Sequence, residues 1–278
     1  MKHINVKKIK IGALSIFILI TLLIVYAIGN ENTNGILKIA FLNVGEGSAI
    51  FVRTPNGNQF LIDAGPDASI LRALGRAMPF YDRSLDAVFV TDTDEVHIGG
   101  MPEILKDYAV GEYFSSRGLS GNNAYEAVQN EIAQKNIKTN ILQTGDTFDI
   151  GGGAYVKIIY AENGLAVIEI IYGDTTFLIP SDVSANTQTY LAQILGAQLK
   201  SNVFAVPHYG SKEYVSDEFL SAVDPKFSVL SLDQNNRFGY PDTETLAALS
   251  AIQSTVLETY VGDIFFVSDG QNVEKSGL

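Results

Sequence analysis

Short apolar runs alternate with longer amphipathic stretches from Gly35 to the end of the chain. Apolar runs of about four to eight residues bounded by turn residues predict β-strands, and longer stretches with helical periodicity predict α-helices. The predicted strands cover residues 36–44, 49–54, 58–64, 87–92, 110–114, 137–143, 154–160, 165–172, 175–180, 202–207, 226–232, 254–260 and 263–269. The predicted helices cover residues 68–76, 98–106, 186–196, 214–222 and 242–250.

The order of these elements predicts a layered fold. Strands come first in antiparallel hairpins, then alternate with helices, and the same order recurs in the second half of the chain. The hairpin turn at residues 55–58 has Asn-Gly at its centre, which is a strong turn signal. This order suits neither a doubly wound parallel sheet nor a sandwich of sheets alone. It predicts one α+β domain over residues 36–278, a four-layer αββα sandwich in which two mixed sheets pack face to face with helices outside.

The N-terminal region has a different pattern. Residues 11–29 carry no charge and follow a basic tip at residues 1–10. A helix of this length is just long enough to cross a hydrocarbon core of ~30 Å, and the lysines before it predict a cytoplasmic tip and an extracytoplasmic body. The alternative is a cleaved signal peptide, whose apolar region usually runs only ~7–15 residues and ends in small residues. The favoured interpretation is a single-pass anchor in the cell membrane, followed by a polar linker at residues 30–35.

Charge is unevenly distributed along the chain. The first 29 residues contain four lysines and no acid, so the remainder holds 15 basic against 31 acidic residues, a net charge of −16. So acidic a body repels polyanions, whereas nucleic-acid binding depends on Lys and Arg that neutralise phosphates. Broad electrostatic binding of DNA is therefore not expected, although a local basic patch stays open.

The counts of cysteine and histidine limit the possible chemistry. The chain has no cysteine, which excludes disulfides, thiolate zinc sites and cysteine nucleophiles. It has three histidines, His3, His97 and His208. Because His3 lies in the basic tip, a metal site in the body has two imidazoles at most.

Four loops at the ends of predicted strands carry candidate chemistry, because functional residues gather on such loops. These loops are residues 91–100 (TDTDEVHIGG), 179–182 (IPSD), 206–211 (VPHYGS) and 235–241 (NNRFGYP). Each has an ordinary structural alternative. Acids in the first loop can cap the helix that follows, and a solitary histidine such as His208 is more often a satisfied structural group than a ligand.

Taken in order, these loops and their surroundings resemble a known family. The matching blocks are 41–66 (FLNVGEGSAIFVRTPNGNQFLIDAGP), 74–100 (LGRAMPFYDRSLDAVFVTDTDEVHIGG), 163–182 (NGLAVIEIIYGDTTFLIPSD), 206–212 (VPHYGSK) and 235–241 (NNRFGYP). They resemble the metallo-β-lactamase superfamily and, within it, the extracytoplasmic domain of ComEC-type competence proteins, which act in DNA uptake. The resemblance covers about residues 36–270 and implies that superfamily's αββα fold for the body.

The resemblance also implies a metal site. Active members of the superfamily hold two metal ions, which generate hydroxide from water and polarise the scissile bond. In this chain, the matching ligand positions are held by Asp92, Asp94, His97, Asp182 and His208, with Asp94 and His97 the catalytic candidates if the site is active. Three carboxylates and two imidazoles suit one harder ion, such as Mn²⁺ or Fe²⁺, better than a pair of zinc ions.

Other positions depart from the pattern of that family. Asp92 and Tyr240 stand where histidines are usual, Tyr209 stands where a second histidine is frequent, and Val96 replaces an aspartate close to the nucleophile of active enzymes. In the opening block, Asn43, Glu46 and Ser48 stand where Asp, Gln and Asp are usual. A valine neither accepts a proton nor ligates a metal, and a phenol with a pKa of ~10 must ionise to bind one tightly.

These departures predict that dinuclear hydrolysis is lost. The expected function is a non-catalytic binding or scaffolding module at the cell surface, whose degenerate site holds one divalent ion (Mn, Fe or Zn) or none. The expected partners are the membrane, through residues 11–29, and the DNA-uptake machinery or other membrane proteins. The alternative is an atypical metal-dependent hydrolase of the phosphodiesterase or nuclease type, linked to DNA uptake.

Overall fold

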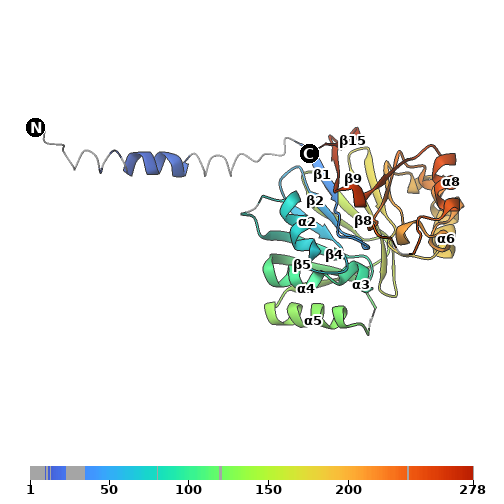
Figure 1. Ribbon diagram of the computed structural model, residues 1–278, viewed down its shortest axis with the longest axis horizontal. Coiled ribbons are helices and arrows are strands. Elements are labelled where there is room, and N and C mark those ends of the chain that lie inside the picture. Colours follow the sequence, from blue (N-terminus) through green and yellow to red (C-terminus); the bar gives the residue numbers. More distant parts are fainter. Residues whose placement is uncertain are drawn as a thin grey trace, which may run out of the picture.

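The computed structural model describes residues 10, 12, 14–22, 35–79, 81–118, 121–236 and 238–277 (Figure 1). The strands of sheet A are β1 (Leu37–Phe41), β2 (Ile50–Arg53), β3 (Gln59–Ile62), β4 (Ser84–Val90), β5 (Ala109–Ser116), β6 (Lys138–Leu142), β14 (Ile264–Ser268) and β15 (Val273–Ser276). They lie in the order β15-β14-β1-β2-β3-β4-β5-β6. The first strands pair antiparallel, and β3 to β6 pair parallel.

Sheet B contains β7 (Thr147–Gly151), β8 (Ala154–Glu162), β9 (Leu165–Tyr172), β10 (Thr175–Ile179), β11 (Val203–Ala205), β12 (Phe227–Leu230) and β13 (Thr255–Glu258). Their order is β13-β12-β11-β10-β9-β8-β7, with β7 to β10 antiparallel and β10 to β13 parallel. Both sheets are therefore mixed, which confirms the prediction of two mixed sheets.

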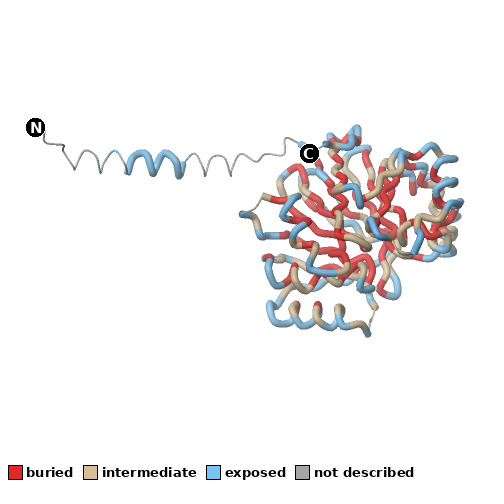
Figure 2. The backbone as a smooth tube through the Cα atoms, in the orientation of Figure 1, coloured by how far each residue is buried: buried red, intermediate tan, exposed pale blue. Residues whose placement is uncertain are grey.

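Helices cover the outer face of each sheet. The α-helices of the body are α2 (Ser69–Ala77), α3 (Glu95–Ile98), α4 (Met101–Asp107), α5 (Asn123–Lys135), α6 (Ala185–Leu195), α7 (Asp217–Val223) and α8 (Thr243–Ala251). Apolar side chains of α2, α4 and α5 pack on sheet A, and those of α6, α7 and α8 pack on sheet B. A third core lies between the sheets, where buried residues line the inner faces of both (Figure 2).

The alternation of apolar residues along the strands explains this layering. In β1, Ile39 faces the core between the sheets while Ala40 faces the helices, because successive side chains of a strand point to opposite faces. The inter-sheet core is dominated by aromatic and β-branched residues, and Phe89 stacks on Phe114 with ring centroids 4.6 Å apart. Such a core needs no disulfide to hold it.

The parallel strands determine where the candidate site forms. Asp63 follows β3, Asp92 follows β4, Asp182 follows β10 and His208 follows β11. Carboxyl ends of parallel strands meet at one edge of a sheet, and ligands bind in the crevice outside such ends. The two sheets therefore bring their loops together at one end of the sandwich.

The structure corrects the predicted elements at four places. The sequence reading missed α5, β7 and β15, and the predicted helix 98–106 is divided between α3 and α4. The division falls at Gly99 and Gly100, where a Cβ would lie 2.0 Å from the Pro66 carbonyl oxygen and 2.4 Å from that of Ala64. The helix α5 was missed because only Val128 and Ile132 are buried, so its apolar periodicity is weak.

The predicted N-terminal anchor lies largely outside the described residues. Within the predicted segment 11–29, residues 12 and 14–22 are described, and they are helical and exposed. The remainder of that segment, residues 1–9 of the tip and residues 30–34 of the linker lie outside the described part. Among the described residues, no helix has both the length and the apolar character that a membrane crossing requires. The anchor therefore stays a prediction.

Candidate metal centre

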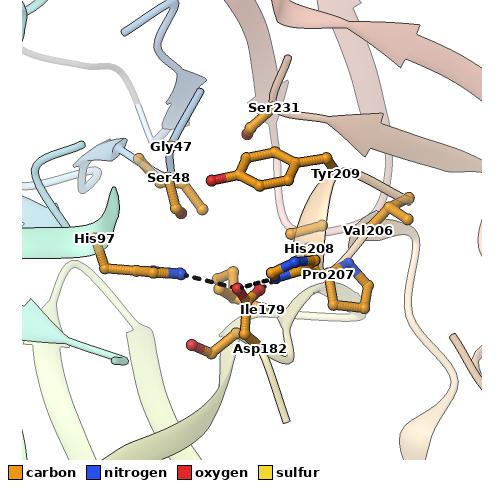
Figure 3. Close-up of a pocket in the computed structure, with 13 residues that line it drawn as sticks. Gly47, Ser48, His97, Ile179, Asp182, Val206, Pro207, His208, Tyr209 and Ser231 are labelled. Atoms are coloured by element: carbon orange, nitrogen blue, oxygen red, sulfur yellow. Dashed lines mark hydrogen bonds and ion pairs between the residues drawn. The ribbon is translucent and has the colours of Figure 1, made fainter. Parts of the chain in front are cut away.

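Asp182 lies between the two histidines of the body. Its Oδ2 atom is 3.5 Å from Nε2 of His97 and 2.8 Å from Nδ1 of His208 (Figure 3). Its Oδ1 atom accepts a hydrogen bond from the backbone N–H of His208, at 2.9 Å. Although burial alone would raise the pKa of Asp182, the two imidazoles hold it far below its ordinary value. The carboxylate is therefore ionised, and both of its oxygens are held in place.

His97 is held by a second carboxylate on its other side. Its Nδ1 atom lies 2.8 Å from Oδ2 of Asp63, which leaves Nε2 directed at Asp182. The imidazole is only 4% exposed. Burial alone would lower the pKa of His97, but the carboxylates of Asp63 and Asp182 raise it well above its ordinary value.

Asp63 is the site residue that the sequence reasoning missed. It is fully buried, and its carboxylate accepts hydrogen bonds from the backbone N–H of Thr91 at 2.8 Å and from the Thr91 hydroxyl at 2.6 Å. The signal for it was present, because the block 41–66 that resembles the family contains Leu-Ile-Asp. A carboxylate that fixes the distal nitrogen of a histidine is the usual second layer of a metal site.

Asp92 completes a group of three potential ligands. One atom each from Asp92, His97 and Asp182 lies within 4.8 Å of the others, and among the described residues this is the group that could hold a metal ion. Burial raises the pKa of Asp92 to about 6. Its Oδ1 atom accepts a hydrogen bond from the backbone N–H of Asp94 at 2.9 Å. The side chain of Asp94 is exposed and is not part of the group.

His208 lies on the far side of Asp182 and is not part of that group either. Its ring stacks on that of Tyr214, with centroids 4.0 Å apart and an interplanar angle of 15°. Both His208 and Tyr209 adopt positive φ angles, 41° and 58°, which L-residues rarely adopt. Because its Nδ1 is engaged with Asp182, His208 positions the carboxylate in this structure.

Tyr209 lies over the space between the histidines, and its hydroxyl points across the cavity toward Ser48 (Figure 3). The cavity beneath it has a volume of about 30 Å³ and is lined by the imidazoles, Asp182, Ser48 and Tyr209. A single water needs about 10–15 Å³, so there is room for an ion and one small ligand. Burial raises the pKa of Tyr209 far above its ordinary value, which keeps the phenol neutral.

Two other residues that differ from the family pattern, Tyr240 and Val96, lie around the cavity. Tyr240 stacks between Tyr209 and the exposed ring of Phe238, with centroid separations of 6.5 and 6.1 Å. Val96 is half-buried, and its carbonyl oxygen accepts a hydrogen bond from the backbone N–H of Ser48. Neither Tyr240 nor Val96 adds a donor to the three-residue group.

The donor set fits one divalent metal ion. Two carboxylates and one imidazole supply three ligands, and carboxylates favour harder ions while imidazole suits zinc, iron and copper. The Nε2 atom of His97 is already aimed at the group, since Nδ1 is held by Asp63. Among the described residues, no cluster with the ligands of a second ion is found.

Comparisons with known proteins agree with the fold of the body. The protein is 23% identical over 247 residues to ComE operon protein 3 of Bacillus subtilis, covering 80% of this chain and 32% of that protein. It is 25% identical over 203 residues to competence protein ComA of Neisseria gonorrhoeae, covering 72% and 27%. The metallo-β-lactamase fold protein YhfI of Bacillus subtilis superposes with a TM-score of 0.55 at 13% identity, over 83% of this chain and 99% of YhfI.

The chain has the metallo-β-lactamase fold and is a distant homologue of the ComEC-type competence proteins. No family model matches it. The chain spans about a third or less of the length of its curated relatives. The homology extends over 72–81% of this chain.

Proposed function

We propose that this ComEC-like body is a non-catalytic binding or scaffolding module that holds a single divalent metal ion. The ion's ligands are Asp92, His97 and Asp182, and Mn²⁺, Fe²⁺ or Zn²⁺ fits that donor set. The module is anchored in the cell membrane through residues 11–29, with the body outside. By analogy with its relatives, it works beside DNA-uptake machinery or other membrane proteins.

The observation that carries this proposal is the size of the site. The cavity of about 30 Å³ under Tyr209 is lined by His97, Asp182 and His208, and it is far smaller than an ordinary substrate pocket. Ligand pockets usually measure ~300–1,000 Å³. Val96 supplies neither a base nor a ligand, and the donors of a second ion are absent from the three-residue group.

The surrounding residues have roles that follow from their contacts. The bound ion would supply charge that fixes the strand-end loops of sheets A and B against each other. Asp63 holds His97 in the orientation that presents Nε2, and the backbone N–H and Nδ1 of His208 orient Asp182. In the metal-free protein the raised pKa of His97 keeps a proton on the imidazole, so binding an ion displaces that proton.

The second candidate is an atypical metal-dependent hydrolase of the phosphodiesterase or nuclease type. It is favoured by the buried pairing of His97 with Asp63, because a carboxylate that orients a metal-binding imidazole is typical of active metal sites. Under this alternative Tyr209 must leave the cavity before a phosphodiester can reach the ion. A body with a net charge of −16 favours a small substrate over long DNA.

Metal content and hydrolysis distinguish the two candidates. The full chain, produced with added manganese and zinc and purified in mild detergent, is assayed by elemental analysis and with bis-p-nitrophenyl phosphate. We expect about one ion per chain, loss of that ion in Asp182→Asn, retention in the exposed control Asp107→Asn, and no hydrolysis. Hydrolysis that disappears in Asp182→Asn would establish the hydrolase, and a metal-free protein would refute both.

A further inference from the structure

Strand β13 forms an open edge of sheet B. It pairs with β12 on one side and is the last strand of the sheet, so its other side has no neighbouring strand among the described residues. The backbone N–H of Thr255 donates to the carbonyl oxygen of Lys226 at 2.9 Å, so the backbone groups of Thr255 and Leu257 face β12. Alternate residues point the other way. The N–H and C=O groups of Val256 and Glu258 therefore face the open edge.

The other three edges of the two sheets are protected against pairing, whereas β13 is not. Exposed charged residues lie on each of them: Glu274 and Lys275 on β15, Lys138 on β6, and Asp149 on β7, where the register also shifts at a bulge. Charged side chains, proline and bulges are the usual means by which proteins block open edges. Strand β13 has a regular register, no lysine and no proline, and its single charged residue is its last. This edge is therefore able to accept another strand.

The surface beside this edge carries no charge. No charged residue lies between Glu244 and Glu258, in a body that holds 31 acidic and 15 basic residues. Helix α8 forms most of this stretch and lies at the margin of the body (Figure 1). It buries Leu249 and exposes Leu246 and Ala251, so both of its faces are apolar. A helix that is apolar all round is usually buried, which indicates that another molecule covers α8.

The turn that follows β13 extends this apolar surface. Its side chains Tyr260 and Val261 are 41% and 79% exposed, and Val261 is the most exposed large apolar side chain among the described residues. The turn is fixed, because the hydroxyl of Thr259 accepts a hydrogen bond from the backbone N–H of Leu232 at 3.0 Å. An exposed apolar patch of this kind is typical of a protein interaction site.

A second copy of this chain fits the open edge. A two-fold axis at Leu257 places Val256 opposite the partner's Glu258, and Glu258 opposite the partner's Val256. These are the residues whose backbone groups face outward, and in an antiparallel ladder each such pair exchanges both N–H···O bonds. No like charges lie opposite each other in this register. Because two bodies of net charge −16 repel each other, an uncharged surface is where they can meet.

We propose that the chain forms a two-fold dimer in which the two β13 edges pair antiparallel. The two copies of sheet B then form one continuous sheet, flanked by the two copies of α8 and of the turn at residues 259–261. Strands β11 and β10, which lead to the metal centre, lie two and three strands away from the contact. The dimer goes beyond the proposed function and needs neither the metal ion nor the membrane anchor.

Cysteine substitution tests the register, because the chain contains no cysteine. At the axis, Leu257 lies opposite its own copy in a non-hydrogen-bonded pair, whose Cα atoms are ~4.5 Å apart and within disulfide range. Thr255 is the matched control, since it is exposed on the same edge but lies about 13 Å from its own copy in this register. The full chain in mild detergent is oxidised and run on a non-reducing gel. We expect a disulfide dimer from Leu257→Cys and none from Thr255→Cys.

A second experiment measures the strength of the contact by sedimentation velocity. Val256→Pro removes an N–H that faces the open edge and breaks no hydrogen bond within the sheet, a position where edge strands tolerate proline. We expect its dimer dissociation constant to rise at least about tenfold, whereas Val256→Thr, which keeps the N–H, should change it less than about twofold. The dimer fraction of the parent chain should rise with NaCl from about 50 to about 500 mM, because salt screens the repulsion.

Val261→Glu keeps this test open if the proline variant does not fold. It adds an acid to the exposed turn of each copy and should also weaken the dimer. A chain that stays monomeric at all concentrations would overturn the proposal and leave the edge to a strand of another protein. Equal disulfide formation through both cysteines, or a dimer unaffected by Val256→Pro and Val261→Glu, would also overturn it, because the copies would then meet through another surface.

Discussion

The two halves of the candidate metal centre come from different sheets and are held by different forces. On the sheet A side, His97 and Asp92 are buried, and His97 is fixed by the carboxylate of Asp63. On the sheet B side, His208 is half-buried and lies among tyrosine rings, and its Nδ1 is hydrogen-bonded to Asp182. The same residue type therefore presents a nitrogen to the group in one half and orients a ligand in the other.

This difference indicates which half of the site is held more firmly. A buried polar network is costly unless every member is satisfied, and His97 meets that condition through Asp63, which Thr91 in turn holds. Aromatic stacking at the sheet B half tolerates substitution more readily, because ring contacts are less directional than buried charged hydrogen bonds. The following predictions test whether the halves differ in this way.

The largest effect is expected from Asp63→Ala. The substitution leaves the Thr91 N–H and Nδ1 of His97 buried without their acceptor, and it places alanine at a φ of 57°. Breaking a buried charged pair costs about 3–5 kcal/mol of folding free energy. Urea denaturation measures the loss, and the exposed control Asp107→Ala should change stability by less than about 0.5 kcal/mol. Equal losses in the two variants would show that the sheet A network is not a stabilising unit.

The next largest effect, on metal affinity, distinguishes His97 from His208. His97→Gln is expected to abolish metal binding, because it removes the imidazole ligand. His208→Gln is expected to weaken metal affinity only about tenfold, as is typical when an orienting partner of a ligand is lost. Competition titration with a chelating dye gives both affinities. Equal losses would mean that His208 is itself a ligand and that the two halves are equivalent.

The sequence predicted the layers of the fold, and the family resemblance put Asp92, His97 and Asp182 among the expected ligands, whose ligand atoms the structure brings within 4.8 Å of one another. It did not indicate that Asp94 faces solvent or that Nδ1 of His208 is turned to Asp182. Those outcomes depend on loop geometry, such as the positive φ of His208, which no local pattern encodes. Helix α5 was hidden for a related reason, since tertiary contacts to a few residues hold it rather than a strong amphipathic pattern.

Asp92→Asn is expected to stabilise the metal-free protein moderately, whereas Asp63→Ala destabilises it. Burial raises the folded pKa of Asp92 to about 6, above the ~3.9 of an unfolded chain, so the folded state binds this proton more tightly. Stability therefore falls as pH rises between those values, and asparagine, which mimics the protonated form, avoids the loss. We expect a gain of about 3 kcal/mol at pH 7.5 and little change at pH 4.

Urea denaturation in EDTA across this pH range measures the effect. His97 does not hide the effect of Asp92→Asn. Its raised pKa stabilises the folded state in full below pH ~6.5, and this stabilisation is lost only as the pH rises through the raised pKa. A constant difference between Asp92→Asn and the parent protein at all pH values would argue against a buried, uncompensated carboxylate. Added metal should reverse the ranking, since only the parent retains all three ligands.

The smallest effect on stability, but the sharpest test of the comparison, comes from restoring one residue in each half, Val96 after β4 of sheet A and Tyr209 after β11 of sheet B. Val96→Asp and Tyr209→His restore the residue types that the family resemblance implies at those positions, and Val96 is half-buried, so each change should cost under about 1 kcal/mol. Replacing the phenol also opens the cavity of about 30 Å³ that Tyr209 covers. Elemental analysis should find one ion per chain in each single variant and more than one only in the double variant. If the double variant still binds only one ion, the residue types at positions 96 and 209 do not explain the missing second site. The loop geometry around His208 would then be its cause.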